Sequence, residues 1–165
     1  MAFLRLSLLD SRNFIVPGII LVVTTPGFAA VYLTVEQAQQ AIFPGQNFTA
    51  MDLSTLSVKQ KIWQTNEGGF FITDKVVGKH ELITYAVGIN SDGSIRQIEI
   101  MDYREAYGHE IRQKRWRRQF IGKTAVSPLN LNEDIKNISG ATLSCRHVTE
   151  GVQRIMSLYE RMLKK

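Results

Sequence analysis

The chain has 165 residues, of which 44% are hydrophobic and 21% are charged. This composition is typical of one globular domain with an apolar core, and it excludes a disordered or fibrous chain. A formal net charge of +5 suits anionic partners such as phosphate groups, nucleic acid or anionic lipid, without choosing among them. Cys145 is the only cysteine, which excludes an intrachain disulfide, a CxxCH haem site and an all-cysteine metal site. Redox chemistry in this chain therefore needs a bound cofactor.

The first residues have the pattern of an export signal. Two arginines precede the apolar run from Phe14 to Val23, and the small residues Gly27 and Ala29 follow it at the spacing that a signal peptidase recognises. We expect cleavage after Ala29, which makes residues 1–29 a signal peptide. The alternative is an uncleaved anchor, since residues 14–33 are about long enough to cross a bilayer. Both interpretations place the domain outside the cytoplasm, in the periplasm or on the outer face of the cytoplasmic membrane.

Two helices are predicted in the first part of the exported region. The stretch from Thr34 to Phe43 has Thr34 as an N-cap and Glu36 in its first turn. Its apolar positions share one helix face, namely Val35, Ala38 and Ile42. The polar sequence that follows has no clear period, and we favour a helix over Ser57 to Trp63.

A β-hairpin is predicted next. The segments "ELITYAVGIN" (Glu81 to Asn90) and "SIRQIEIMDY" (Ser94 to Tyr103) flank the turn sequence "NSDG". Apolar residues alternate along both segments at Ile83, Tyr85, Val87 and Ile89, and at Ile98 and Ile100. Strict alternation on both sides of a turn predicts two antiparallel strands with one buried face.

A basic segment follows the hairpin, from Tyr103 to Lys123. Its residues Ile111, Trp116 and Phe120 define one face of a predicted helix. Basic side chains with interleaved aromatic residues are one signature of nucleic-acid binding. A solvated helix whose aromatic residues anchor it to the core explains the same pattern. We favour the second interpretation and expect no nucleic-acid partner, because an exported protein rarely meets nucleic acid.

The last part of the chain predicts a long amphipathic helix that begins near Thr142. Apolar residues recur every three or four positions, at Val148, Val152, Ile155, Tyr159 and Met162. The turn Ser139-Gly140-Ala141-Thr142 stands directly before it. Free amides and the positive end of the helix dipole would hold an anion there, and the small residues would let it approach the backbone. The simpler alternative is that Ser139 or Thr142 only caps the helix.

The residue motif of this turn favours an anion-binding site over a simple helix cap. Ser139-Gly140-Ala141-Thr142, followed by Leu143-Ser144 and an amphipathic helix, resembles the flavin-binding motif of the FMN-binding domain family. That family includes the flavin subunits of sodium-translocating NADH:quinone reductase and of the Rnf complex. The resemblance implies that FMN is bound by these six residues and is joined to Thr142 through a phosphoester, installed after export by an FMN transferase. It extends more loosely over Val31 to Leu163, so residues 30–165 are expected to form the FMN-binding domain.

One position departs from the family motif. The transferase motif has an aspartate six residues before the acceptor threonine, where this chain has Lys136, with Asp134 two residues earlier. Two alternatives follow for the attachment. Asp134 serves from a longer turn, or the site binds FMN without the ester bond.

Together these features predict an α+β domain, an antiparallel sheet with packed helices that holds FMN at the start of the last helix. The resemblance implies an exported electron carrier that works with membrane or periplasmic redox proteins, since flavin takes one or two electrons. We identify no catalytic acid or nucleophile and no metal site, because His80, His109 and His147 lack metal-ligand spacing. The alternative function is a flavin-free interaction module that docks an acidic protein or membrane through Arg112 to Arg118.

Overall fold

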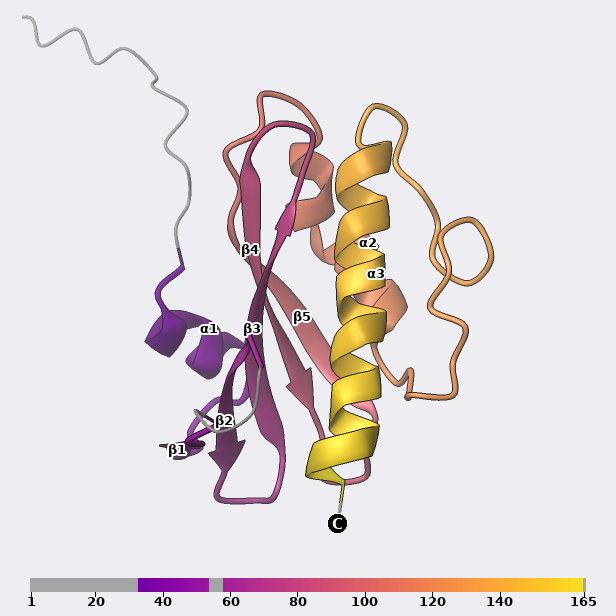
Figure 1. The fold of residues 1–165 in the computed structure, drawn as a ribbon. Helices are drawn as coiled ribbons and strands as arrows, with labels where there is room; N and C mark the ends of the chain where they lie inside the picture. Colours follow the sequence, from indigo (N-terminus) through magenta and orange to yellow (C-terminus); the bar gives the residue numbers. More distant parts are fainter. Residues whose placement is uncertain (1–32, 54–57, 165) are drawn as a thin grey trace, which may run out of the picture.

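The computed structural model describes residues 33–53 and 58–164, and these form an antiparallel sheet with helices on both faces (Figure 1). The elements run in the order α1 (Val35–Ile42), β1 (Phe48–Ala50), β2 (Lys61–Thr65), β3 (Phe70–Val77), β4 (Leu82–Ile89), β5 (Ile95–Asp102), η1 (His109–Arg112), α2 (Lys114–Arg117), η2 (Arg118–Phe120), α3 (Thr142–Leu158) and η3 (Tyr159–Leu163). The predicted α+β class is confirmed. The expected signal peptide, residues 1–29, lies outside the described residues, and no described helix is both long and apolar enough to span a membrane.

The five strands follow one another across the sheet in chain order, each antiparallel to the last. The predicted hairpin is confirmed as β4 and β5, in which Tyr85 pairs with Ile100 and Val87 pairs with Ile98. Its turn is closed by a hydrogen bond of 2.9 Å from the Asn90 amide to the Ser94 carbonyl. A meander of this kind needs only short connections, because neighbouring antiparallel strands can be joined by tight turns.

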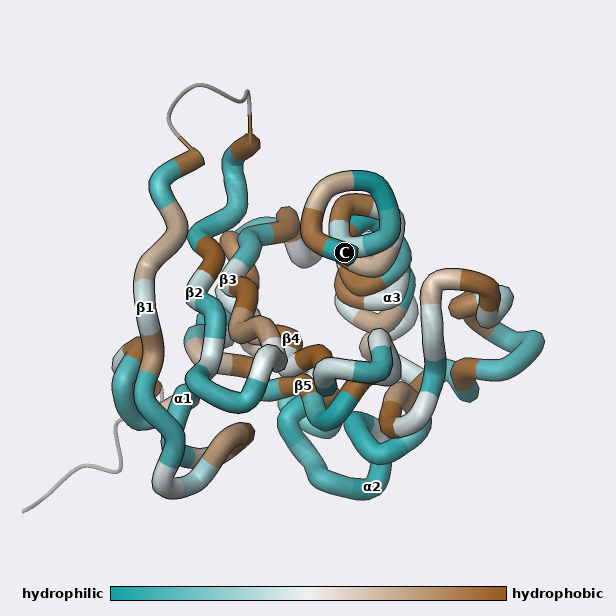
Figure 2. Tube along the Cα trace, turned by 90° about the horizontal axis from the view of Figure 1, so that it is seen from below, coloured by the Kyte–Doolittle hydropathy of each residue, from teal (hydrophilic) through white to brown (hydrophobic). Residues whose placement is uncertain are grey.

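The main core lies between the sheet and α3, which are seen end-on in Figure 2. The predicted stripe of α3 is confirmed at Val148, Val152, Ile155 and Tyr159, all of which are buried. Met162 does not belong to it, since 41% of this residue is exposed. The helix ends before it in the wider, π-type turn η3, which shifts the facing of later residues relative to a regular α-helix.

The opposite face of the sheet is also buried, so the prediction of one buried face for the hairpin was incomplete. Helix α1 covers this face and begins with the predicted Thr34 cap, whose hydroxyl accepts a hydrogen bond from the Gln37 amide. Ala38 and Ile42 are buried as predicted, whereas Val35 is only half-buried. They form a second apolar cluster with Phe43, Phe71, Ala86 and Met101.

The predicted helix over Ser57 to Trp63 was wrong. Ser57 lies outside the described residues, and Trp63 belongs to strand β2. The Trp63 ring contacts Phe71 of the neighbouring strand at a centroid distance of 5.5 Å. Cross-strand aromatic pairs of this kind stabilise a sheet by about 0.2–1 kcal/mol each. Because this pairing is not local in the sequence, a search for helical periods does not detect it.

The basic segment forms three short helical pieces, η1, α2 and η2, and not the single helix that was predicted. Gln113 adopts an extended conformation (φ −67°, ψ 136°) and separates the first two. Ile111, Trp116 and Phe120 are nevertheless buried together as expected. The indole of Trp116 donates a hydrogen bond of 2.9 Å to the Lys136 carbonyl, which ties the segment to the loop that precedes α3.

Arg117 is not part of the exposed basic surface. Only 8% of the residue is exposed, and its guanidinium forms an ion pair with the buried carboxylate of Glu99 on β5. It also donates to the carbonyls of Ile98 (2.7 Å) and Arg112 (3.0 Å). These bonds satisfy a charge that burial would otherwise penalise heavily.

We predict that Arg117→Ala lowers the free energy of unfolding by about 3–5 kcal/mol, because it leaves the Glu99 carboxylate buried without its partner. The neighbouring Arg118→Ala, at an exposed position, should change it by no more than about 0.5 kcal/mol. Urea unfolding of the two variants makes the comparison. Equal stability of the two would contradict a structural role for the buried pair.

Candidate functional site

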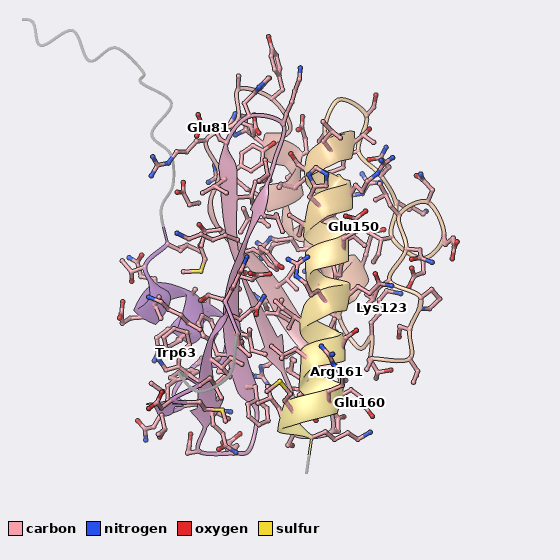
Figure 3. The ribbon with its side chains drawn as sticks, in the orientation of Figure 1. Trp63, Glu81, Lys123, Glu150, Glu160 and Arg161 are labelled. Atoms are coloured by element: carbon pink, nitrogen blue, oxygen red, sulfur yellow. The ribbon has the colours of Figure 1, made fainter. Side chains whose placement is uncertain are left out.

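Three segments meet at the end of the sheet where α3 begins. They are the β3–β4 turn, the chain that leaves β5, and the turn before α3 (Figure 1). Glu81 marks this end in Figure 3. Between the segments lies a cleft of about 670 Å³, within the range of small-molecule sites. Its lining residues are Lys79, His80, Glu81, Arg104, Glu105, Ala106, Tyr107, Gly140, Ala141, Thr142, Leu143 and Ser144.

The start of α3 opens into this cleft without a side-chain cap. Ala141 is the N-cap residue, and no side chain bonds to the first turn. The amides of Thr142, Leu143 and Ser144 have no acceptor among the described residues, and the helical ladder starts with Cys145 donating to Ala141 at 2.9 Å. Gly140 makes the turn with φ +83°, a conformation that favours glycine. The alternative that Ser139 or Thr142 caps the helix was therefore wrong.

The Thr142 side chain is held by its neighbour Asn137. The Asn137 amide group donates a hydrogen bond of 3.0 Å to Thr142 Oγ1, while Asn137 Oδ1 accepts from the Ile138 amide at 2.8 Å. The threonine oxygen therefore acts as an acceptor and keeps its own proton to donate. Thr142 is half-buried, so its hydroxyl is oriented by the protein at the wall of the cleft.

Tyr103 ties the chain after β5 to the first turn of α3. Its hydroxyl lies 3.1 Å from Ser144 Oγ and 2.5 Å from the Tyr107 carbonyl, to which it donates. Burial raises the pKa of Tyr103, which keeps this hydroxyl protonated. Tyr103 and Ser144 are both buried, so their contact fixes the distance between the chain after β5 and the first turn of α3, which form two walls of the cleft.

Glu105 holds the β3–β4 turn in place. One carboxylate oxygen accepts hydrogen bonds from the amides of His80 (2.7 Å) and Glu81 (3.0 Å). Only 6% of the residue is exposed. Burial raises the pKa of the carboxyl group, but the bonds from backbone amides outweigh this effect and the pKa lies below its usual value. The carboxylate is therefore ionised at neutral pH and anchors the turn that carries Lys79.

The rim of the cleft offers both cations and apolar surface. Lys79 and Arg104 are exposed there, and Arg104 also pairs with Asp102 at 3.2 Å. Tyr107 and Leu143 are apolar residues with exposed fractions of 82% and 41%. Exposed apolar groups beside cations and free amides suit a ligand with one apolar and one anionic end.

Comparison with known families matches residues 78–157 to the model described as FMN-binding domain. These 80 of the 165 residues are therefore similar to the FMN-binding domain family. The matched range contains all three segments that form the cleft. A search of curated proteins found no match. The match to the suspected family is thus confirmed over residues 78–157, and the description of that family names FMN binding.

The FMN-binding domain brings most of the expected site residues together. Gly140, Ala141, Thr142, Leu143 and Ser144 all line the cleft. Ser139 is exposed and does not line it. The residues contributed by the β3–β4 turn and by the chain after β5 were not predicted, because nothing in their local sequence marks them. Only the meander order of the strands brings them to the end of the sheet where α3 begins.

Lys136 and Asp134 occupy structural positions in the loop before α3. The Lys136 amide donates to Gln119 at 2.8 Å, and its carbonyl receives the Trp116 bond. The Asp134 carboxylate pairs with Lys123 at 2.7 Å and accepts from the amides of Leu129 and Asn130. Burial raises the pKa of the Asp134 carboxyl group, but these bonds outweigh this effect, so the pKa lies below its usual value. Asp134 is therefore committed to its own loop, which disfavours its service as the motif aspartate.

The cysteine and two of the histidines make contacts that are typical of structural side chains. Burial raises the pKa of the Cys145 thiol to about 11, so it is a neutral, buried group as expected. His147 contacts the Val77 carbonyl through Nδ1 at 2.5 Å, and His109 packs edge-on against Tyr103. Within residues 33–53 and 58–164, no group of three or more His, Cys, Asp or Glu side chains is arranged to hold a metal ion.

We predict that Glu105→Gln lowers the free energy of unfolding by about 1 kcal/mol at pH 7, because a neutral amide oxygen is a weaker acceptor for the turn amides. The folded-state pKa of Glu105 is depressed, so its contribution is complete above the ordinary value of 4.5. It is lost as the pH falls through the lower folded-state value.

Urea unfolding of wild type and Glu105→Gln between pH 7 and pH 3 measures this effect. The difference between the two proteins should shrink as the solution becomes acidic. Glu81→Gln, an exposed change in the same turn, is the control and should show almost no difference at any pH. A Glu105 effect that is independent of pH would contradict the anchoring by its carboxylate.

Proposed function

We propose that the FMN-binding domain holds FMN in the cleft at the start of α3, with the phosphate at the uncapped first turn. The observation that carries this proposal is the set of amides without acceptors at Thr142, Leu143 and Ser144, inside the segment that matches the family. An anion at this position would gain hydrogen bonds and the favourable helix dipole at once.

The other residues of the cleft fit the rest of such a ligand. Lys79 and Arg104 would add positive charge near the phosphate, and Tyr107 and Leu143 would offer apolar surface to the flavin ring. The anchored turn and the Tyr103 contacts would hold these groups in place before the ligand arrives, which lowers the entropy cost of binding. Bound FMN would supply one- or two-electron redox chemistry, and the protein would bind it and tune its potential.

We further propose that FMN is joined to Thr142 through an ester between Thr142 Oγ1 and the phosphate, made by an FMN transferase. The hydroxyl stands at the cleft wall with its proton free, oriented by Asn137. Ala141 and Gly140 place little bulk beside it. Lys136 in place of the motif aspartate bears on recognition by the transferase and not on the space around Thr142.

We predict that Thr142→Ala abolishes flavin that survives denaturation, while Thr142→Ser retains part of it because the hydroxyl remains. Mass spectrometry of denatured protein, produced together with an FMN transferase, is the measurement. Ser139→Ala is the matched control, because its hydroxyl stands outside the cleft, and it should keep the FMN mass. An unmodified Thr142 peptide in the wild type would disprove the ester and leave FMN held by the helix start alone.

In the cell, we propose that the protein is an exported electron carrier between membrane-bound and periplasmic redox proteins. The apolar N-terminal run supports export, and a covalent flavin would not be lost outside the cytoplasm. A docking surface is offered by Lys114, Arg115 and Arg118, which are exposed, with Arg112 half-buried beside them. The buried Arg117 is not part of it. Such a surface would attract an acidic partner and speed association at low salt.

We predict that Lys114→Glu combined with Arg118→Glu slows flavin reduction by native membranes several-fold at low ionic strength, and weakens its salt dependence, because the attraction is lost. Flavin content should not change. Lys61→Glu combined with Lys164→Glu, the same charge change at exposed positions outside the basic segment, is the control.

Equal rates in both double variants would assign the basic segment to a solvated surface. A wild-type protein without flavin that still binds membranes through these residues would favour the alternative of an interaction module.

A further inference from the structure

A second cleft lies at the opposite end of α3. It has a volume of about 760 Å³ and lies between β3, the C-terminal part of α3 and the chain that leads into β2. Figure 3 shows one of its residues, Arg161, near the end of the helix, far from Glu81. Thr142 and Leu158 are sixteen helical positions apart, which corresponds to roughly 24 Å along the axis. The two clefts are therefore separate.

A buried carboxylate forms the floor of this second cleft. Asp74 on β3 is 8% exposed and accepts a hydrogen bond of 2.9 Å from the Tyr85 hydroxyl and one of 2.8 Å from Arg154. Burial and the charge of Asp74 raise the pKa of Tyr85, so the tyrosine stays a donor. Gly151 makes this possible, because a Cβ there would lie only 2.1 Å from the Tyr85 oxygen.

These contacts fix the Arg154 guanidinium while leaving most of its donors unused. Asp74 is its only hydrogen-bond acceptor among the described residues, although a guanidinium carries five N–H groups. About half of the side chain is exposed. A guanidinium held by a buried carboxylate loses less freedom when it binds an anion than a free arginine does.

Positive charge predominates among the residues that line this cleft. The cleft is lined by Lys59, Lys75, Arg154 and Arg161, against the single carboxylate of Asp74. Lys59 and Lys75 form no ion pair with any described residue, and Arg161 bonds only to the Ser157 carbonyl, at 3.2 Å. Like charges gathered in a hollow repel one another unless an anion joins them.

We propose that this second cleft binds a phosphate ester that carries at least two negative charges, with Arg154 as its central contact. A guanidinium matches phosphate oxygens in pairs, and Lys59 and Arg161 would balance the remaining charge. Leu158 and the exposed part of Met162 form an apolar wall beside the cations, which would accommodate an apolar portion of the ligand. A soluble phosphate ester and a phospholipid headgroup share this chemistry.

This site is independent of the cleft at the start of α3. Among the residues that line it, only Arg154 lies within the segment that matches the FMN-binding domain family. The site is therefore a property of the surrounding elements of this chain, and its test does not depend on flavin.

Titration of isotope-labelled full-length protein with pyrophosphate, followed by amide chemical shifts, tests the proposal. We expect shifts at Gln60, Asp74 and Arg154, and a dissociation constant that rises about tenfold or more in Lys59→Gln combined with Arg161→Gln, which removes two charged contacts. Both changes are at exposed positions. Lys79→Gln combined with Arg104→Gln, in the flavin cleft, should leave these shifts and this constant unaltered.

Shifts absent from this cleft, or equal affinity in wild type and the Lys59/Arg161 variant, would overturn the proposal and mean that the cations only complement the C-terminal end of the helix dipole. Sedimentation with vesicles that contain phosphatidic acid, whose headgroup is a phosphate monoester that can carry two negative charges, then identifies the source of the ligand. A loss of vesicle binding in the Lys59/Arg161 variant assigns a lipid headgroup, and unaltered vesicle binding assigns a soluble phosphate ester. Flavin content should be the same in the wild type and the Lys59/Arg161 variant.

Discussion

The packing of α3 along the sheet determines where the two clefts of the molecule lie. Val148, Val152 and Ile155 are fully buried in the core between α3 and the sheet, where α3 packs on β3 and β4, and each large apolar side chain buried in this way stabilises the contact by about 1.5–3 kcal/mol. This stripe sets the rotation and the height of the helix. Its first turn therefore stands at the end of the sheet where β3 turns into β4, and its last turn stands beside Asp74.

Because the two clefts lie at opposite ends of this helix, they offer different kinds of binding groups to an anion. At the start of α3, the binding groups are backbone amides, and the protein keeps them free by placing Ala141 at the position of the cap. Near the end of α3, the helix dipole is unfavourable to anions, and the binding groups have to be side chains. There the Arg154 guanidinium is fixed by Asp74 and Tyr85. One helix thus supports two kinds of anion recognition.

The local parts of the fold could be predicted from the sequence. The hairpin alternation from Ile83 to Ile89, the cap at Thr34 and the period of α3 each follow from neighbouring residues, and each was confirmed. The helix over Ser57 to Trp63 failed because a strand's place in a sheet depends on distant partners, here Phe71. The basic segment was predicted as one helix because its period continues across Gln113, where the backbone becomes extended.

The site could be predicted only on one of its walls. The Ser-Gly-Ala-Thr turn is contiguous in the sequence, and its residue motif indicated the resemblance to the family. Lys79, Glu105 and Tyr107 come from segments that meet it only after the sheet is assembled. The role of Glu105 in particular depends on its reach across the turn to the amides of His80 and Glu81, which no local pattern encodes.

The visible absorption spectrum of full-length protein, purified from an exporting host, shows whether the cleft at the start of α3 holds FMN. We predict flavin bands at about one FMN per chain, and a lower flavin content in Gly140→Val, which places a branched side chain at a turn position with φ +83° beside the free amides. A protein that carries no flavin and acquires none when FMN is added would contradict it.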